Sequence, residues 1–230
     1  MNKKEEFRKR HLVTISFPAS ALRPLQKLYW QVYAEMLDSE VVMGIKLHEE
    51  DPDLEGVSMR WFFANSEKAV RIFRNVFDGC SLRQIREIFG TKRDLVRVVQ
   101  ANIIEIRGGY PTGRWHSDFT DIDLGAGESG TLLTPLFTFK PHFGGLETTG
   151  AKRGVSDDYD GESEVYRYRD GEAVLFDGSA MIHRTQSYTA AEDERRVLVS
   201  WQLADTRPAL IPVLCRIGKR NGDPMFFSSH

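Results

Sequence analysis

The stretch Gly113-Arg114-Trp115-His116-Ser117-Asp118-Phe119 is the most informative segment of this 230-residue chain. On an extended backbone, residues i and i+2 project from the same face, so His116 and Asp118 present an imidazole and a carboxylate to one cavity. A second histidine, His183, lies in the strand-like run Met181-Ile182-His183-Arg184-Thr185. Two histidines and one carboxylate leave the opposite face of a metal open, which suits iron(II) better than zinc. Taken alone, a His-x-Asp pattern is more often a hydrogen-bonded surface pair, so its surroundings decide.

Two further segments favour the metal site over a surface pair. Residues 171–178, Gly-Glu-Ala-Val-Leu-Phe-Asp-Gly, predict a strand and a turn that deliver His183 to the mouth of a barrel. Residues 194–201, Glu-Arg-Arg-Val-Leu-Val-Ser-Trp, predict a strand that opens with two arginines. An arginine that points into the barrel would pair in a bidentate manner with a dicarboxylic co-substrate whose other end chelates the metal.

The rest of the chain predicts helices first and strands afterwards. Apolar residues recur at spacings of three and four over 22–37, 69–77 and 82–89, which predicts three helices. After residue 100, short apolar or alternating runs are separated by Gly, Asp and Pro, with no helical pattern between them. These strand-like runs lie at 102–106, 131–139, 145–149, 165–169, 173–176, 181–187, 196–203 and 210–215.

We therefore expect an α+β, mainly β fold, namely an antiparallel sandwich or jelly roll with N-terminal helices packed on the outside of the barrel. The whole chain, 1–230, is expected to form one composite domain. Its parts would be a helical region at 12–100, a jelly-roll core at 101–216 and a C-terminal tail at 217–230.

Composition excludes several classes of protein. Hydrophobic residues make up 41% of the chain, Lys+Arg (31) nearly balance Asp+Glu (33), and the net charge is −2, which is typical of a globular protein and gives no basic field for nucleic acid or anionic membranes. No apolar run of about 18 residues occurs, and no signal-like segment follows Met1, so we expect a soluble, cytoplasmic protein. Cys80 and Cys215 are expected to be buried thiols, and residues 1–10 a solvated terminus.

At these residues the sequence resembles the iron(II)- and 2-oxoglutarate-dependent oxygenases, in their phytanoyl-CoA dioxygenase-like and prolyl-hydroxylase-like branches. Four blocks carry the resemblance in the family's order: residues 115–119, 144–147, 171–178 with His183, and 195–201. The resemblance implies a double-stranded β-helix (a cupin-like jelly roll) in which His116, Asp118 and His183 hold Fe(2+). It also implies that 2-oxoglutarate and O2 are co-substrates. The intact carboxylate at Asp118 implies hydroxylation, desaturation or cyclisation rather than halogenation.

The resemblance leaves the 2-oxoglutarate site open between two arginines. Arg195 shares strand parity with Trp201, and the family often has an inward aromatic residue six positions beyond its arginine, so Arg195 is preferred and Arg196 is the alternative. Thr131 and Thr134 are further candidates for contact with 2-oxoglutarate. The weaker candidates for substrate binding are Arg107, Tyr110, Arg114, Lys140, His142 and Trp201.

Two other functions stay open on the sequence. A cupin-like metal enzyme that does not use 2-oxoglutarate would keep the same metal ligands without needing either arginine. A binding protein that has lost its chemistry would be expected to have lost a ligand as well. A small-molecule substrate is expected, a peptide or protein side chain is the alternative, and the oligomeric state is left open.

Overall fold

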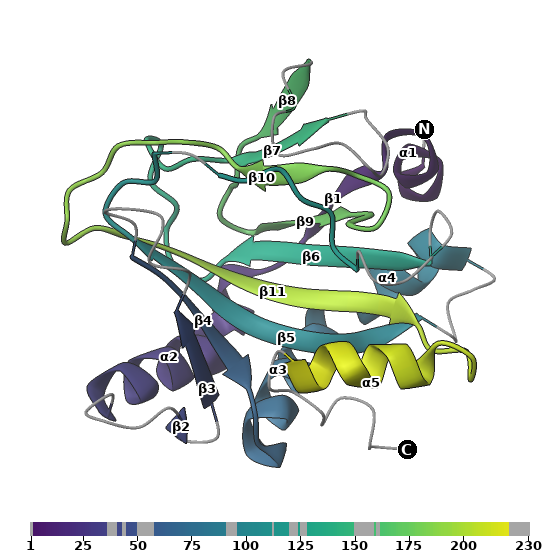
Figure 1. Ribbon diagram of the computed structural model, residues 1–230, viewed down its shortest axis with the longest axis horizontal. Helices are drawn as coiled ribbons and strands as arrows, with labels where there is room; N and C mark the ends of the chain where they lie inside the picture. Colours follow the sequence, from purple (N-terminus) through teal and green to yellow (C-terminus); the bar gives the residue numbers. More distant parts are fainter. Residues whose placement is uncertain are drawn as a thin grey trace.

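A large antiparallel β-sheet organises the molecule. The structure is a computed structural model that describes residues 2–35, 41–42, 45–49, 58–90, 96–111, 113–119, 124, 128–149, 159 and 162–220 (Figure 1). The strand order of the large sheet is β1 (Leu12–Ser16), β9 (Glu172–Phe176), β6 (Ser129–Pro135), β11 (Arg195–Asp205), β5 (Val96–Arg107), β4 (Ser58–Ala64), β3 (Ile45–Glu49) and β2 (Val41–Val42). A smaller antiparallel sheet has the order β10 (His183–Thr185), β7 (Leu146–Thr149) and β8 (Ser163–Tyr166).

Of the described helices, all but the last cover the large sheet on the side away from the small sheet; the last helix packs on the other face, with Leu214 against Ala204 and Phe119. The helical elements are α1 (Lys3–Arg10), a short 3-10 turn (Ala19–Leu22), α2 (Arg23–Glu35), α3 (Glu67–Cys80), α4 (Leu82–Phe89) and α5 (Ile211–Arg220). Figure 1 shows α2 and α3 on one side of the large sheet and β7, β8 and β10 on the other. No helix in the described ranges is long and apolar enough to cross a bilayer.

The two faces of the large sheet bury different sets of side chains. Trp201 and Leu132 pack in one apolar cluster with Phe73 of α3. Leu198 and Leu133, from the same two strands, pack in a second cluster with residues of the small sheet. Since successive residues of a strand point to opposite faces, Arg196, Leu198, Ser200 and Gln202 of β11 face the small sheet, whereas Arg195, Val197, Val199 and Trp201 face the helices.

The mainly antiparallel architecture with added helices is confirmed, as are the three helices expected from periodicity, α2, α3 and α4. The expectation that residues 12–100 are helical is wrong in part, because β1 and β4 lie within them. Val13 and Ile15 of β1 alternate with more exposed residues, and β1 pairs with β9. The aromatic run Trp61-Phe62-Phe63 lies in β4, which pairs with β5. Residues 36–40 and 50–57, within the same region, lie outside the described residues.

Both ends of the chain also differ from the expectation. Residues 2–10 are solvated, as expected, but they form an ordered helix: Asn2 caps α1 in a capping box, and Phe7 is buried against Phe89, with ring centroids 5.5 Å apart. Residues 210–215 are not a strand but the start of α5. The tail expected at 217–230 starts within α5, and residues 221–230 lie outside the described residues. Cys80 and Cys215 are free thiols, each partly buried.

Candidate metal centre

The fold brings His116, Asp118 and His183 together as the sequence predicts. Their ligand atoms all lie within 4.8 Å of one another. The backbones of His116 and His183 are joined by two hydrogen bonds, of 3.0 and 2.9 Å, and their ring centroids are 4.4 Å apart. The backbone N–H of Asp118 donates to the Gly178 carbonyl at 2.7 Å. Two segments far apart in sequence therefore form one cluster of two imidazoles and a carboxylate.

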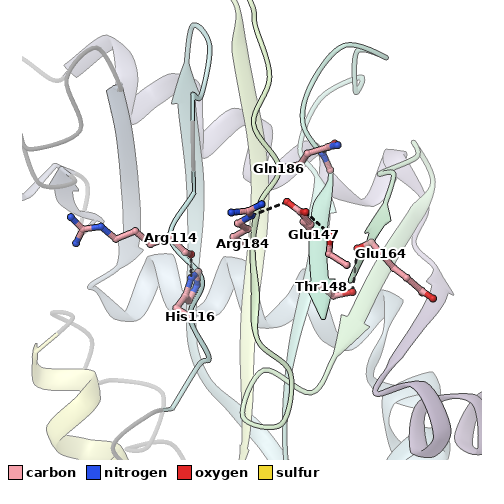
Figure 2. A network of polar contacts seen from close by, with 9 residues as sticks. Arg114, His116, Glu147, Thr148, Glu164, Arg184 and Gln186 are labelled. Carbon is pink, nitrogen blue, oxygen red and sulfur yellow. Dashed lines mark hydrogen bonds and ion pairs between the residues drawn. The ribbon is translucent and has the colours of Figure 1, made fainter. Parts of the chain in front are cut away.

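Backbone carbonyl groups orient both imidazoles. Nδ1 of His116 lies 3.0 Å from the Arg114 carbonyl oxygen, as Figure 2 shows, and Nδ1 of His183 lies 3.3 Å from that of Met181. An Nδ1–H that donates to a carbonyl fixes the tautomer and leaves Nε2 as the free ligand atom. Nε2 of His183 lies 3.8 Å from Oδ1 of Asp118.

The protonation state of His183 suits a metal ligand. Burial, together with the neighbouring His116, lowers the pKa of His183 to about 4, although Asp118 opposes this effect. His183 is therefore neutral near pH 7 and available as a ligand. Thr131 donates its hydroxyl to Oδ2 of Asp118 at 2.5 Å, which orients the carboxylate. Two imidazole nitrogens and one carboxylate on one side are the donor set of a non-haem iron(II) site, so these residues fit that metal.

Arg184, the residue next to His183, fixes the segment that carries His183 through contacts with two other segments. Arg184 faces away from the cluster, donates its Nε–H to Glu147 at 2.8 Å and stacks 4.1 Å over the Trp115 ring. Glu147 in turn accepts from Ser163 at 2.6 Å. Figure 2 shows the contact between Arg184 and Glu147, which joins β10 to β7. This ion pair and stack connect the chain segments that carry His116 and His183.

The structure corrects the preference for Arg195 as the arginine inside the barrel. Arg195 faces the helices, where its guanidinium lies 4.3 Å over the Tyr33 ring and 5.9 Å from Trp30. Arg196 is only 2% exposed and faces the small sheet. The parity argument used Trp201 as an inward residue, but Trp201 faces outward and donates its Nε1–H to the Phe73 carbonyl at 3.2 Å.

Arg196 is buried between the two sheets, beside aromatic rings and a backbone carbonyl. Its Nε–H donates to the Gly144 carbonyl at 3.0 Å, and its guanidinium carbon lies 5.3 Å from the centre of the Tyr168 ring. The buried hydroxyls of Tyr168 and Tyr188 have no hydrogen-bond partner among the described residues. Burial raises the pKa of each to about 12, and the charge of Arg196 opposes that rise. A guanidinium beside two buried hydroxyl donors fits a carboxylate.

The other candidate site residues from the sequence do not lie together in the structure. Thr131 contacts Asp118, as described above, but Thr134 faces the opposite side of β6 and donates to the Glu172 carbonyl at 2.8 Å. The Arg114 side chain points away from His116 (Figure 2). Arg107 donates to the Glu192 carbonyl at 3.2 Å, and the Tyr110 backbone pairs with that of Tyr188.

Lys140 and His142 are not brought to the metal cluster. Both contact Glu194, at 2.7 and 3.1 Å, and these contacts lower the pKa of that carboxyl to about 2.

Sequence reasoning missed the polar floor beside the metal cluster. Gln202 pairs across the large sheet with Thr131 and Gln100, and Ser200 pairs with Leu133 and Asn102. Gln100, Asn102, Ser200 and Gln202 therefore lie on the face that carries Thr131. Oδ1 of Asn102 is buried and has no hydrogen-bond partner in the described part of the chain. The sequence pattern that could have revealed this floor is the placement of polar residues at every second position of two otherwise apolar strands.

Comparison with known proteins supports the fold. The sequence matches no family model and no curated protein. The structure is similar to the epimerase SnoN in complex with Fe3+, alpha ketoglutarate and nogalamycin RO, with a TM-score of 0.65 and 13% identity over 96% of this chain and 93% of that chain. It is also similar to HygX from Streptomyces hygroscopicus with nickel and 2-oxoglutarate bound (TM-score 0.55, 13% identity, 85% and 83% covered). A Pseudomonas putida prolyl-4-hydroxylase gives a TM-score of 0.52 at 17% identity, with 88% and 96% covered.

These solved structures establish the class of fold. The chain has the fold of the iron(II)- and 2-oxoglutarate-dependent oxygenases, so the resemblance seen in the sequence is confirmed at that level. The His116–Asp118–His183 cluster adds the donor set that iron requires.

Proposed function

We propose that this chain is a non-haem iron(II) oxygenase with a double-stranded β-helix fold, which couples decarboxylation of 2-oxoglutarate to the oxidation of a small organic substrate. One observation carries the proposal. The facial cluster of His116, Asp118 and His183 shares the space between the two sheets with Arg196 and the unpartnered tyrosine hydroxyls beside it. A metal ligand set and a buried guanidinium with free hydroxyl donors in one interior are what a chelating dicarboxylic acid needs.

Two groups of residues would bind the two ends of 2-oxoglutarate. His116, Asp118 and His183 would hold iron, which when bound supplies the redox chemistry that couples loss of CO2 to oxidation of the second substrate. Arg196 would neutralise the far carboxylate of 2-oxoglutarate, and Tyr168 and Tyr188 would donate to the same group. Thr131 keeps the Asp118 carboxylate in its ligand orientation.

The substrate would lie beside the metal over the polar floor of β5 and β11. Gln100, Asn102, Ser200 and Gln202 are neutral, so they favour a substrate with hydroxyl or amide groups over a charged one. Hydroxylation is the reaction that we propose, with desaturation and cyclisation as alternatives, and the intact carboxylate of Asp118, which would be the third metal ligand, argues against halogenation. A peptide side chain is the competing substrate class, and a turnover screen against both libraries separates the two.

The decisive experiment compares two adjacent arginines. Purified protein with iron(II) is expected to release succinate from 2-oxoglutarate, and His116→Ala is expected to abolish this release. Arg196→Gln should raise the KM for 2-oxoglutarate by about 30-fold or more, because it removes the buried partner of a carboxylate. Arg195→Gln is the matched control, since its side chain faces the helices, and it should leave that KM within about threefold.

Three outcomes would count against the proposal. Wild-type protein that binds iron but not 2-oxoglutarate would favour a cupin-like metal enzyme of another reaction class. Equal KM values for wild type and Arg196→Gln would exclude Arg196 as the carboxylate partner. Protein that binds no iron, nickel or manganese would remove the proposed function altogether.

A further inference from the structure

A fully buried carboxylate lies behind the metal cluster without belonging to it. Asp177 is 0% exposed. Its Oδ1 accepts a hydrogen bond from the Ser179 hydroxyl at 2.9 Å and from the Ala180 N–H at 3.3 Å. The Ser129 hydroxyl lies 3.1 Å from the same oxygen and 2.7 Å from Oγ of Ser179. A buried carboxylate with several donors is held in one orientation, and it holds its donors in turn.

Asp177 begins the turn that contacts two of the three metal ligands. The Asp177 carbonyl accepts the Met181 N–H at 2.8 Å, which closes the turn. Within it, the Gly178 carbonyl accepts the Asp118 N–H at 2.7 Å. The Met181 carbonyl lies 3.3 Å from Nδ1 of His183. The position of this turn therefore sets both the backbone of Asp118 and the ring orientation of His183.

A second path runs from Asp177 to Asp118 through β6. Ser129 is two residues before Thr131, so both side chains project from the same face of the strand. Thr131 donates to Oδ2 of Asp118 at 2.5 Å. Ser129 thus joins the Asp177 carboxylate to the strand that orients the Asp118 carboxylate. The two paths arrive at different atoms of Asp118, its N–H and its Oδ2.

His11, near the start of the chain, also contacts Asp177. The Asp177 N–H donates to the His11 carbonyl at 2.9 Å, and Nδ1 of His11 lies 3.9 Å from Oδ2 of Asp177. His11 has a φ of 54°, in the left-handed region, where it ends α1. A non-glycine residue in that conformation is held there by its surroundings.

We propose that Asp177, with Ser129 and Ser179, is a positioning network that presets Asp118 and His183 for the metal. The inference rests on the proposed function in one respect, namely that the cluster binds a divalent metal. It gives Asp177 no contact with substrate and no part in proton transfer. Outer contacts of this kind change metal affinity by about 10- to 100-fold when they are removed.

The test measures metal binding by the 230-residue chain in the absence of 2-oxoglutarate. Cobalt(II) is the probe, because its visible spectrum reports coordination geometry and its titration gives an affinity. We expect Asp177→Asn, which keeps the size of the side chain and removes its charge, to weaken cobalt(II) binding about 10- to 100-fold and to change the bound spectrum. Ser179→Ala is expected to shift both readouts in the same direction, by about threefold or more.

Ser81→Ala is the matched control. Ser81 is also a fully buried serine, but its hydroxyl donates to the Phe77 carbonyl at 2.8 Å, at the junction of α3 and α4. Its loss should leave cobalt(II) affinity unchanged even where it lowers the unfolding temperature. If Asp177→Asn fails to fold, Ser179→Ala and Ser129→Ala carry the test.

The outcomes separate this inference from the proposed function. Wild-type affinity and spectrum in both Asp177→Asn and Ser179→Ala would overturn the positioning network alone. A control that weakens binding as much as Ser179→Ala would overturn it too, since the effect would then come from general destabilisation. No cobalt(II) binding by wild type would overturn the proposed function and this inference together.

Discussion

Gly178 is the residue with the least room to change near the metal cluster. A Cβ atom built on it would lie 2.8 Å from both Cβ and Cγ of Asp118, and closer still to Oδ2. The Gly178 carbonyl also accepts the Asp118 N–H, so the two backbones cannot move apart without breaking that bond. The close approach itself therefore requires glycine.

Gly178→Ala is expected to weaken metal binding by about tenfold or more, because the new methyl group displaces the Asp118 carboxylate. The measurement is cobalt(II) titration of the folded variant. Gly79→Ala is the control, because a Cβ at Gly79, near the end of α3, meets no atom within 4 Å. It should keep the wild-type affinity and raise the free energy of unfolding by up to about 1 kcal/mol. Unchanged affinity in Gly178→Ala would contradict the tight contact.

The two arginines of β11 show what a residue pattern contains and what it lacks. Alternation along residues 195–201 correctly predicted that one of Arg195 and Arg196 faces inward. The alternation does not say which of the two sets of residues faces inward, and that choice rested on Trp201. Trp201 is buried in either case, since both faces of the large sheet are covered by apolar clusters. A strand buried on both faces leaves no polar side by which to choose.

Among the elements, α5 departs most from its sequence pattern. Leu210, Val213 and Leu214 recur at three and four and pack against Val99 and Ala204 of the large sheet. Six residues hold less than two helical turns, so the same apolar residues also match a short buried strand. Only packing against the end of β5 and β11 decides for the helix. The strands β1 and β4 were missed for a similar reason. The partner of β1 is β9, near the other end of the chain, and two helices separate β4 from its partner β5 in the sequence.

The packing of α5 gives a stability prediction. Leu214 is buried and Ile211, on the same helix, is 37% exposed. Leu214→Ala should lower the free energy of unfolding by about 2–5 kcal/mol, because it leaves a cavity beneath the helix. Ile211→Ala should lower it by less than about 1 kcal/mol. Urea unfolding of the two variants checks both values, and equal losses would show that α5 does not pack on the sheet as described.

At the scale of the whole molecule, the site combines local and distant information. The sequence revealed His116 and Asp118 because their spacing of two is itself the geometry. His183 and the arginine pair were found because their order along the chain resembles that of a known family. Tyr168, Tyr188 and the Asp177 network could not be found in this way, because the roles proposed for them depend on contacts between residues that are distant in sequence.

The same long-range assembly makes metal binding a property of the entire fold. His183 belongs to the small sheet, His116 is joined to it by a single bridge, and Asp118 is held by Thr131 of the large sheet. A metal bound by all three ligands joins these segments and favours the folded state over the unfolded chain. At a free metal concentration of 100 times the Kd, the free energy of unfolding should rise by about 2.7 kcal/mol, and a chelator should reverse this gain. Thermal unfolding with and without nickel(II) measures it, and His116→Ala should show no metal-dependent shift. A shift of wild-type size in that variant would place the metal elsewhere.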